Sequence, residues 1–121
     1  MPRVLVVDDD PSIRQVVGYV LSDEGYTVDE APNGAVAFET IDRQHPDLIL
    51  LDMKMPVMNG WEFARLYRER FNHRAAIIVV TAATDAARRG ADVGADDFLA
   101  KPFDLDVLIE CVSATMRRRA Q

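Results

Sequence analysis

Residues 4–12 read VLVVDDDPS, a stretch that passes directly from four apolar residues into three adjacent carboxylates. The apolar run does not alternate with polar residues, which is typical of a strand covered on both faces of a parallel sheet. Asp10 followed by Pro11 predicts a helix start, because the carboxylate can cap the first amides and proline fits the first helical turn. The stretch therefore predicts a buried strand that leads into a helix, with Asp8 and Asp9 at the junction.

Similar apolar runs recur along the chain at intervals. Unbroken runs lie at Leu48–Leu51 and Ile77–Val80, and weaker runs lie at Tyr26–Asp29 and Asp97–Leu99. With the first run, these segments predict five strands of a sheet whose two faces are both covered.

Apolar residues at helical spacing separate these runs. The expected helices run from Pro11 to before Gly25, over about Asn33–Gln44, over about Asn59–Phe71, over Thr84–Val93, and from Asp104 onward. Val16 and Leu105 belong to the apolar stripes of the first and last helices, so we expect both to face the core. The segment Thr84–Val93 is the weakest helix and the one expected to be most mobile, because its apolar residues are mostly alanines and it contains Gly90.

Strands that alternate with helices predict an α/β fold with right-handed crossovers. We expect a single domain over residues 1–121: a doubly wound, five-stranded parallel sheet with five helices. A length of 121 residues with 49% hydrophobic content is sufficient for one packed core.

Composition excludes several classes of function. Lys and Arg total 14 against 20 Asp and Glu, and a net charge of -6 argues against direct binding of nucleic acid. The single cysteine, Cys111, cannot form an intramolecular disulfide, and no apolar run reaches the ~18 residues of a membrane span. The first apolar run ends at Asp8 after only four residues, far short of the apolar segment of a signal peptide. We therefore expect a cytoplasmic protein that does not enter the membrane.

Polar residues follow four of the expected strands. Asp8 and Asp9 come after the first run, Asp52 after the third, Thr81 after the fourth and Lys101 after the fifth. Because ligands of such sheets bind at the carboxyl ends of the strands, we expect these side chains to meet at one edge.

Three carboxylates, a hydroxyl and an ammonium group suit a hard divalent cation together with an anion. Mg²⁺ prefers a few carboxylates and keeps several waters, and without it the carboxylates repel one another, which should raise at least one pKa. With the cation bound, a carboxylate can attack a phosphoryl group. No segment resembles a nucleotide-binding loop, so the phosphoryl donor should be another molecule.

Four segments together resemble a known family. The segments VLVVDDDPSIR, DLILLDMKMPVMNGWE, IIVVTA and GADDFLAKPFD are similar, in order and spacing, to the receiver domain of two-component response regulators, including the chemotaxis regulators. The likeness covers essentially all 121 residues and implies a flavodoxin-like fold with strand order 2-1-3-4-5. It implies the following roles: Asp52 as phosphoryl acceptor, Asp8, Asp9, Asp52 and the backbone carbonyl of Lys54 as Mg²⁺ ligands, Thr81 and Lys101 as the phosphate-sensing pair, and Thr81 with Phe98 as the switch.

The resemblance also implies partners. The donor would be a phosphohistidine on a histidine kinase or phosphotransfer protein, and small phosphodonors are an alternative source. The domain would not be an enzyme beyond catalysing its own phosphorylation and dephosphorylation. It would act on a downstream protein target or on an output domain outside this chain, and a homodimer through the last helices is a further option. We expect exposed residues of the first helix, such as Arg14, Gln15 and Tyr19, to contact the kinase.

Two other functions stay open at this point. DDDPS also fits the D-x-D-x-S/T motif of haloacid-dehalogenase-like phosphatases, with Asp8 as nucleophile and Asp10 as acid/base. The chain is short for that family and shows no obvious cap insertion, and Asp10 is better explained as a helix cap. The second alternative is an interaction domain on the same fold that does not depend on phosphorylation.

Overall fold

The computed structural model describes residues 2–55, 57–82 and 94–120. Five strands form one sheet of order β2-β1-β3-β4-β5, and every neighbouring pair is parallel. The strands are β1 (Arg3–Val7), β2 (Thr27–Ala31), β3 (Leu48–Asp52), β4 (Ala76–Ala82) and β5 (Asp97–Lys101). The predicted strand order is confirmed, and the strands extend the apolar runs by one or two residues.

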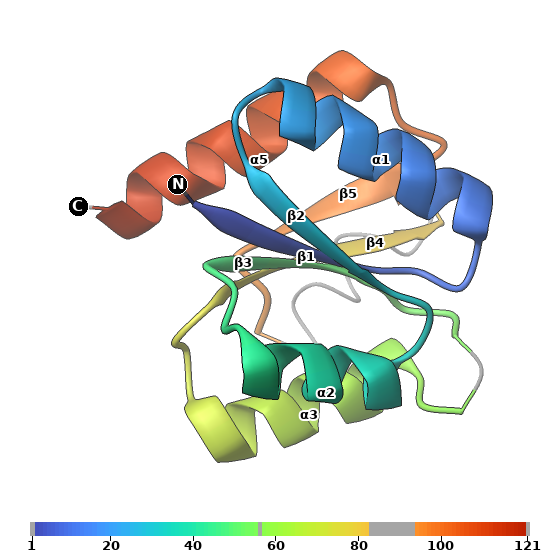
Figure 1. Cartoon of the computed structure of the whole chain (residues 1–121), viewed down its shortest axis with the longest axis vertical. Coiled ribbons are helices and arrows are strands. Elements are labelled where there is room, and N and C mark those ends of the chain that lie inside the picture. The colour runs from blue at the N-terminus through green and yellow to red at the C-terminus, as the bar shows by residue number, and fades with distance from the viewer. Residues whose placement is uncertain (1, 56, 83–93, 121) are drawn as a thin grey trace.

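Helices cover both faces of the sheet (Figure 1). In the described ranges they are α1 (Pro11–Asp23), α2 (Gly34–Arg43), α3 (Gly60–Phe71) and α5 (Leu105–Ala120). Figure 1 shows α1 and α5 on one face and α2 and α3 on the other. The structure thus describes four helices where the sequence predicted five, and the predicted helix at Thr84–Val93 lies outside the described residues. Among the described helices, none is long and apolar enough to cross a membrane.

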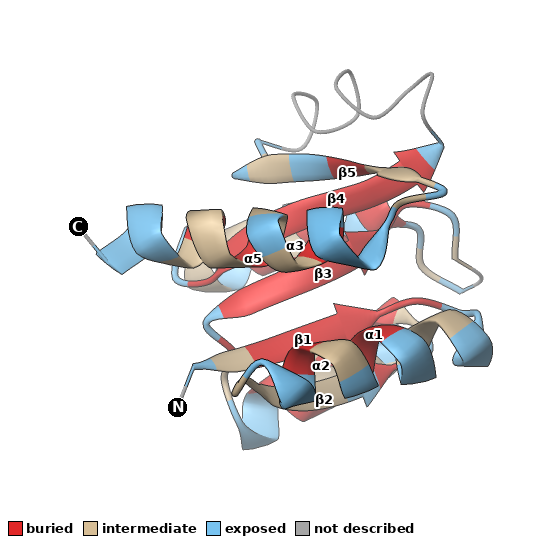
Figure 2. Cartoon of the chain, turned by 90° about the horizontal axis from the view of Figure 1, so that it is seen from above, coloured by how far each residue is buried: buried red, intermediate tan, exposed pale blue. Residues whose placement is uncertain are grey.

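The core consists of two layers that share the sheet. Leu5 and Val7 of β1 pack in the layer of α2 and α3, whereas Val4 and Val6 pack in the layer of α1 and α5. Burial therefore extends over both faces of the central strands, as the colouring of β3 and β4 in Figure 2 shows. This two-sided burial explains the unbroken apolar runs in the sequence.

The helix starts follow from local chemistry. The Asp10 carboxylate accepts hydrogen bonds from the amides of Ser12 and Ile13, which confirms its predicted role as the cap of α1. The Asn59 side chain likewise accepts from the amide of Glu62 at the start of α3. Gly60 follows that cap because α3 begins against the backbone of the preceding loop, where an added Cβ would lie 2.8 Å from the Cα of Met53.

Two stripe residues do not face the core. Val16 is 50% exposed and Leu105 is 41% exposed, so the prediction that both are buried is wrong. Both side chains instead line the cavity at the carboxyl edge of the sheet.

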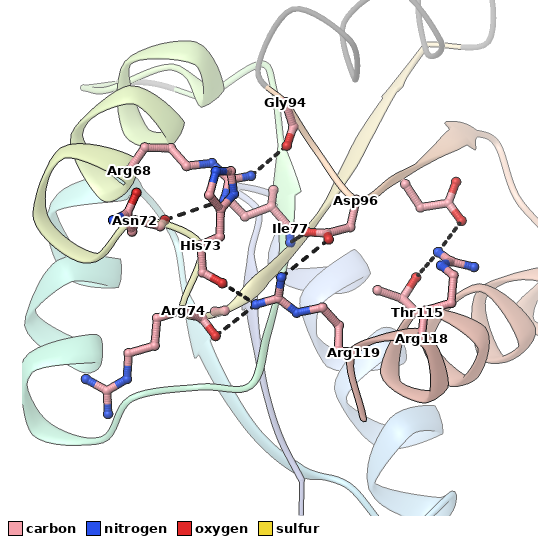
Figure 3. A network of polar contacts seen from close by, with 12 residues as sticks. Arg68, Asn72, His73, Arg74, Ile77, Gly94, Asp96, Thr115, Arg118 and Arg119 are labelled. Carbon is pink, nitrogen blue, oxygen red and sulfur yellow. Dashed lines mark hydrogen bonds and ion pairs between the residues drawn. The ribbon is translucent and has the colours of Figure 1, made fainter. Parts of the chain in front are cut away.

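A polar network fixes the opposite end of the molecule (Figure 3). The guanidinium of Arg119, near the end of α5, donates to the carbonyls of His73 and Arg74 and pairs with Asp96 at 3.6 Å. The other oxygen of Asp96 accepts from the amide of Ile77 at 2.9 Å. The last turn of α5 is therefore tied to the loop before β4 and to the residue before β5.

Candidate functional site

The carboxyl ends of four strands meet around one cavity of about 870 Å³. The predicted polar residues that line it are Asp8, Asp9, Asp52, Lys54, Thr81 and Lys101. Asp52 and Lys101 are the last residues of β3 and β5, and Thr81 is the last but one of β4. The structure thus brings together side chains that lie as far as 93 positions apart in the sequence.

Three carboxylates lie close together in the lining of this cavity. One oxygen each of Asp8, Asp9 and Asp52 lies within 4.8 Å of the others. Asp8 and Asp52 are only 4% and 5% exposed, whereas Asp9 is exposed. The Lys101 Nζ atom lies 3.2 Å from Asp8 Oδ2 and 3.7 Å from Asp52 Oδ2, so a single ammonium group faces two buried carboxylates.

The environment of Asp52 disfavours its ionised form. Burial, followed by the nearby charge of Asp8, raises the pKa of Asp52 to about 6. Lys101 and the amide of Lys54, which donates to Asp52 Oδ1 at 3.2 Å, oppose that shift without cancelling it. The predicted rise of a carboxylate pKa is confirmed at Asp52.

Thr81 contributes a buried hydroxyl group that has no hydrogen-bond partner among the residues that the structure describes. Its side chain is 3% exposed, and within the described part of the chain its Oγ1 atom has no hydrogen-bond partner. A buried hydroxyl without a partner costs stability. Its place on the wall of the cavity suits hydrogen bonding to an oxygen of a bound ligand.

The donor set fits Mg²⁺ on chemical grounds. Three carboxylate oxygens at short mutual distance are hard ligands, and the open side of the cavity leaves room for the waters that Mg²⁺ retains. Lys54 lines the same cavity, and the role of its backbone carbonyl as a ligand stays a prediction.

Lys101 is positioned by its strand and by the turn that follows. In the pairing of β5 with β4, Lys101 lies opposite Ala82, next to Thr81. The Lys101–Pro102 peptide bond is cis. The ammonium and the hydroxyl therefore reach the cavity from adjacent strands.

Phe98 is not part of this cavity. Its side chain is 43% exposed on β5 and lines a separate groove beside α5, with Val107 and Cys111. The switch role of Phe98 stays a prediction.

Arg14 is a residue whose place sequence reasoning missed. It was expected to be exposed for partner recognition, but its side chain is 17% exposed and its Nη1 atom donates to the backbone carbonyl of Asp8 at 2.7 Å. The sequence feature that could have indicated this contact is the position of Arg14 one turn after the Asp10 cap, because a long side chain there can reach back over the start of the helix. By contrast, Tyr19 is 75% exposed, as expected.

The Asp10 geometry bears on the phosphatase alternative. That mechanism needs the Asp10 carboxyl group as an acid/base, yet one of its oxygens accepts from two backbone amides of α1. The phosphatase alternative is therefore not favoured.

Comparisons with known proteins agree with this geometry. The chain matches the sequence model of the response regulator receiver domain over residues 4–113. It is 42% identical over 118 residues to the response regulator MprA of Mycobacterium ulcerans (strain Agy99), with 96% of this chain and 50% of the relative aligned. The chain thus spans about half the length of the curated relatives it matches.

Solved structures give the same result. The chemotaxis protein CheY4 of Vibrio cholerae superimposes with a TM-score of 0.87 at 36% identity, covering 95% of this chain and 98% of that one. The receiver domain of TorR, from a TMAO respiratory system, gives a TM-score of 0.88 at 35% identity and covers 98% of both chains.

Proposed function

Because this chain belongs to the response regulator receiver domain family, we propose that it is a phosphoacceptor domain of a two-component phosphorelay, with Asp52 as the acceptor. The observation that carries the proposal is the shared cavity: a buried carboxylate with a raised pKa, two further carboxylates, an ammonium and an unsatisfied hydroxyl.

The reaction is the transfer of a phosphoryl group to a carboxylate. An oxygen of Asp52 forms the new bond to phosphorus while the bond from phosphorus to the donor, a nitrogen of phosphohistidine, breaks and leaves its electron pair on that nitrogen. Asp8, Asp9, Asp52 and the carbonyl of Lys54 would hold Mg²⁺, which offsets the negative charge of the phosphoryl oxygens. The result is an acyl phosphate at the carboxyl edge of the sheet.

Lys101 and Thr81 then act on the product. The ammonium of Lys101 neutralises one phosphoryl oxygen, and the Thr81 hydroxyl donates to another, which gives a partner to a group that has none among the described residues of the unphosphorylated chain. A shift of Thr81 toward the phosphoryl group makes room for Phe98 to rotate inward and changes the surface around β5.

The partners follow from this chemistry. A histidine kinase or phosphotransfer protein supplies the phosphoryl group, and a separate target or output domain reads the change. In either case the reader of the change lies outside this chain. The domain works in the cytoplasm and is not an enzyme toward other substrates.

The test is phosphorylation by a small phosphodonor with Mg²⁺, followed by intact mass. We expect one phosphoryl group on the wild type, none on Asp52→Asn, and unchanged labelling of Asp23→Asn, an exposed carboxylate on α1. Continuous hydrolysis of phosphate monoesters, lost in Asp8→Asn but kept in Asp52→Asn, would instead support the phosphatase alternative. Partner affinity that is equal with and without phosphodonor would support a phosphorylation-independent domain.

A further inference from the structure

Arg14 connects α1 back to the junction that carries the acidic pair. Its Nη1 atom donates to the carbonyl of Asp8 at 2.7 Å, and its Nε atom lies 3.5 Å from Glu30 Oε1. The side chain of Arg14 is 17% exposed, so this is not a freely solvated cation. The guanidinium thus joins a backbone atom of the proposed metal site to the edge strand β2.

The packing around Glu30 keeps Arg14 in place. The Glu30 carboxylate lies across α1 at Gly18, where an added Cβ would be 3.3 Å from Glu30 Oε2. Glycine at position 18 leaves room for that carboxylate, and the carboxylate in turn fixes the direction of the guanidinium by a charged contact.

The contact with Asp8 completes a set of restraints on the metal-binding junction. The Asp8 amide donates to the carbonyl of Ala31 at 3.1 Å, and Asp8 Oδ1 accepts from the amide of Asp10 at 2.9 Å. Arg14 fixes the remaining polar group of Asp8, its carbonyl. Because the peptide unit is planar, holding that carbonyl also sets the orientation of the Asp9 amide and the position of the Asp9 Cα, from which the Asp9 side chain extends.

We propose that Arg14 is a positioning residue, which holds the Asp8–Asp9 peptide so that both carboxylates converge with Asp52 on one divalent cation. The proposal rests on the proposed function, because it concerns the same metal site. Groups that orient metal ligands through hydrogen bonds raise affinity by reducing the reorganisation that binding requires.

The sign of the effect separates positioning from simple electrostatics. Arg14 is a cation in contact with the backbone of Asp8, beside the proposed metal site, so its charge alone repels Mg²⁺, and removing that charge should tighten Mg²⁺ binding. Loss of positioning has the opposite effect. Arg14→Lys keeps the charge but has one nitrogen, which cannot occupy the places of both Nη1 and Nε, so any loss of affinity in this variant reflects geometry.

The experiment is calorimetric titration of Mg²⁺ into the unphosphorylated chain. We expect Arg14→Ala to bind Mg²⁺ about 10-fold more weakly than the wild type, and Arg14→Lys to fall between the two. Arg65→Ala is the matched control, because Arg65 pairs with Glu69 on the exposed face of α3, and its Mg²⁺ affinity should be unchanged. In Arg14→Lys, the amide resonance of Asp9 should shift while the resonances of the core strands stay in place.

Equal or tighter Mg²⁺ binding by a folded Arg14→Ala overturns the proposal. If Arg14→Ala does not fold, wild-type affinity in Arg14→Lys, with an unshifted Asp9 amide, overturns it equally. A wild-type chain that binds no Mg²⁺ contradicts the proposed function itself, so the two failures are distinguishable.

Discussion

Asp52 is a carboxylate in surroundings that oppose its charge. It is buried, Asp8 adds a second negative charge, and its pKa is raised from 3.8 to about 6. At neutral pH Asp52 is therefore ionised at a cost to the folded chain. Because the pKa of Asp52 is higher in the folded chain than in the unfolded one, the free energy of unfolding falls as the pH rises from 3.8 to about 6.

This cost predicts a more stable Asp52→Asn variant when no divalent cation is present. We expect the free energy of unfolding at pH 7.5 with a chelator to rise by about 1–3 kcal/mol, since one pKa unit corresponds to about 1.4 kcal/mol. Urea unfolding measures the change, with Asp23→Asn as the control. An Asp52→Asn chain that is less stable than the wild type would show that the charge of Asp52 does not destabilise the folded chain.

His45 forms a second, partly buried polar contact, away from the site. Its Nε2 atom lies 2.8 Å from the hydroxyl of Tyr67, and that hydroxyl oxygen accepts from the amide of Ala75 at 2.9 Å. In the neutral imidazole with an unprotonated Nε2, the Tyr67 hydroxyl donates to that nitrogen while its oxygen accepts from Ala75. Burial and the charge of Arg74 lower the pKa of His45, while Asp47 and Asp42 oppose the shift.

The lowered pKa of His45 predicts a pH dependence of stability. Neutral His45 contributes stability that is complete above its ordinary pKa of 6.5 and is lost as the pH falls through its lower value in the folded chain. Between pH 7.5 and pH 5, wild-type stability in urea should fall more than that of His45→Gln. Parallel pH profiles for the two proteins would contradict this role.

The residue chemistry of the site was largely readable from sequence, since polar residues after buried strands of a parallel sheet converge. The contact that Arg14 makes with the site could not be predicted, because a residue at this position of the first helix can equally well face solvent or contact the preceding loop. Only the coordinates show that Glu30 fixes it over α1.

At the scale of elements, the spacing of apolar residues located the helices but did not show which residues of each apolar stripe are buried. Val16 and Leu105 fall on the apolar stripes of α1 and α5, yet both are exposed and line the cavity. Helical spacing indicates which side of a helix is apolar, but not which residues of that side border a cavity. The caps were predictable, because an Asp or Asn before a helix acts through local hydrogen bonds.

The end of α5 offers a test at this scale. Arg119 donates to the carbonyls of His73 and Arg74 and pairs with Asp96, so Arg119→Ala should lower the free energy of unfolding by about 1 kcal/mol. Amide exchange in the last turn of α5 should also become faster.

Arg117→Ala is the matched control for that variant. Arg117 lies in the same last turn but contacts Ser113 and Glu110 of its own helix and is 62% exposed at the side chain. Its loss should change stability by less than about 0.5 kcal/mol. Equal effects of the two substitutions would mean that only the charge of the helix end matters.

At the scale of the whole molecule, the two-sided sheet follows from the apolar runs, and its strand order follows from the family resemblance. The four predicted strand-end positions then meet because the parallel order places their carboxyl ends at one edge. The amino-end network of Arg119 and the carboxyl-end site lie at opposite ends of the same sheet, and the last helix connects them (Figure 1, Figure 3).

The central claim is that Asp52 receives the phosphoryl group. The most direct test is to phosphorylate the chain with a small phosphodonor and Mg²⁺, reduce the acyl phosphate with borohydride and map the modified residue by peptide mass. The account predicts reduction at position 52 alone, and none when Mg²⁺ is replaced by a chelator. Modification at Asp8 or Asp9, or labelling that does not need Mg²⁺, would contradict it.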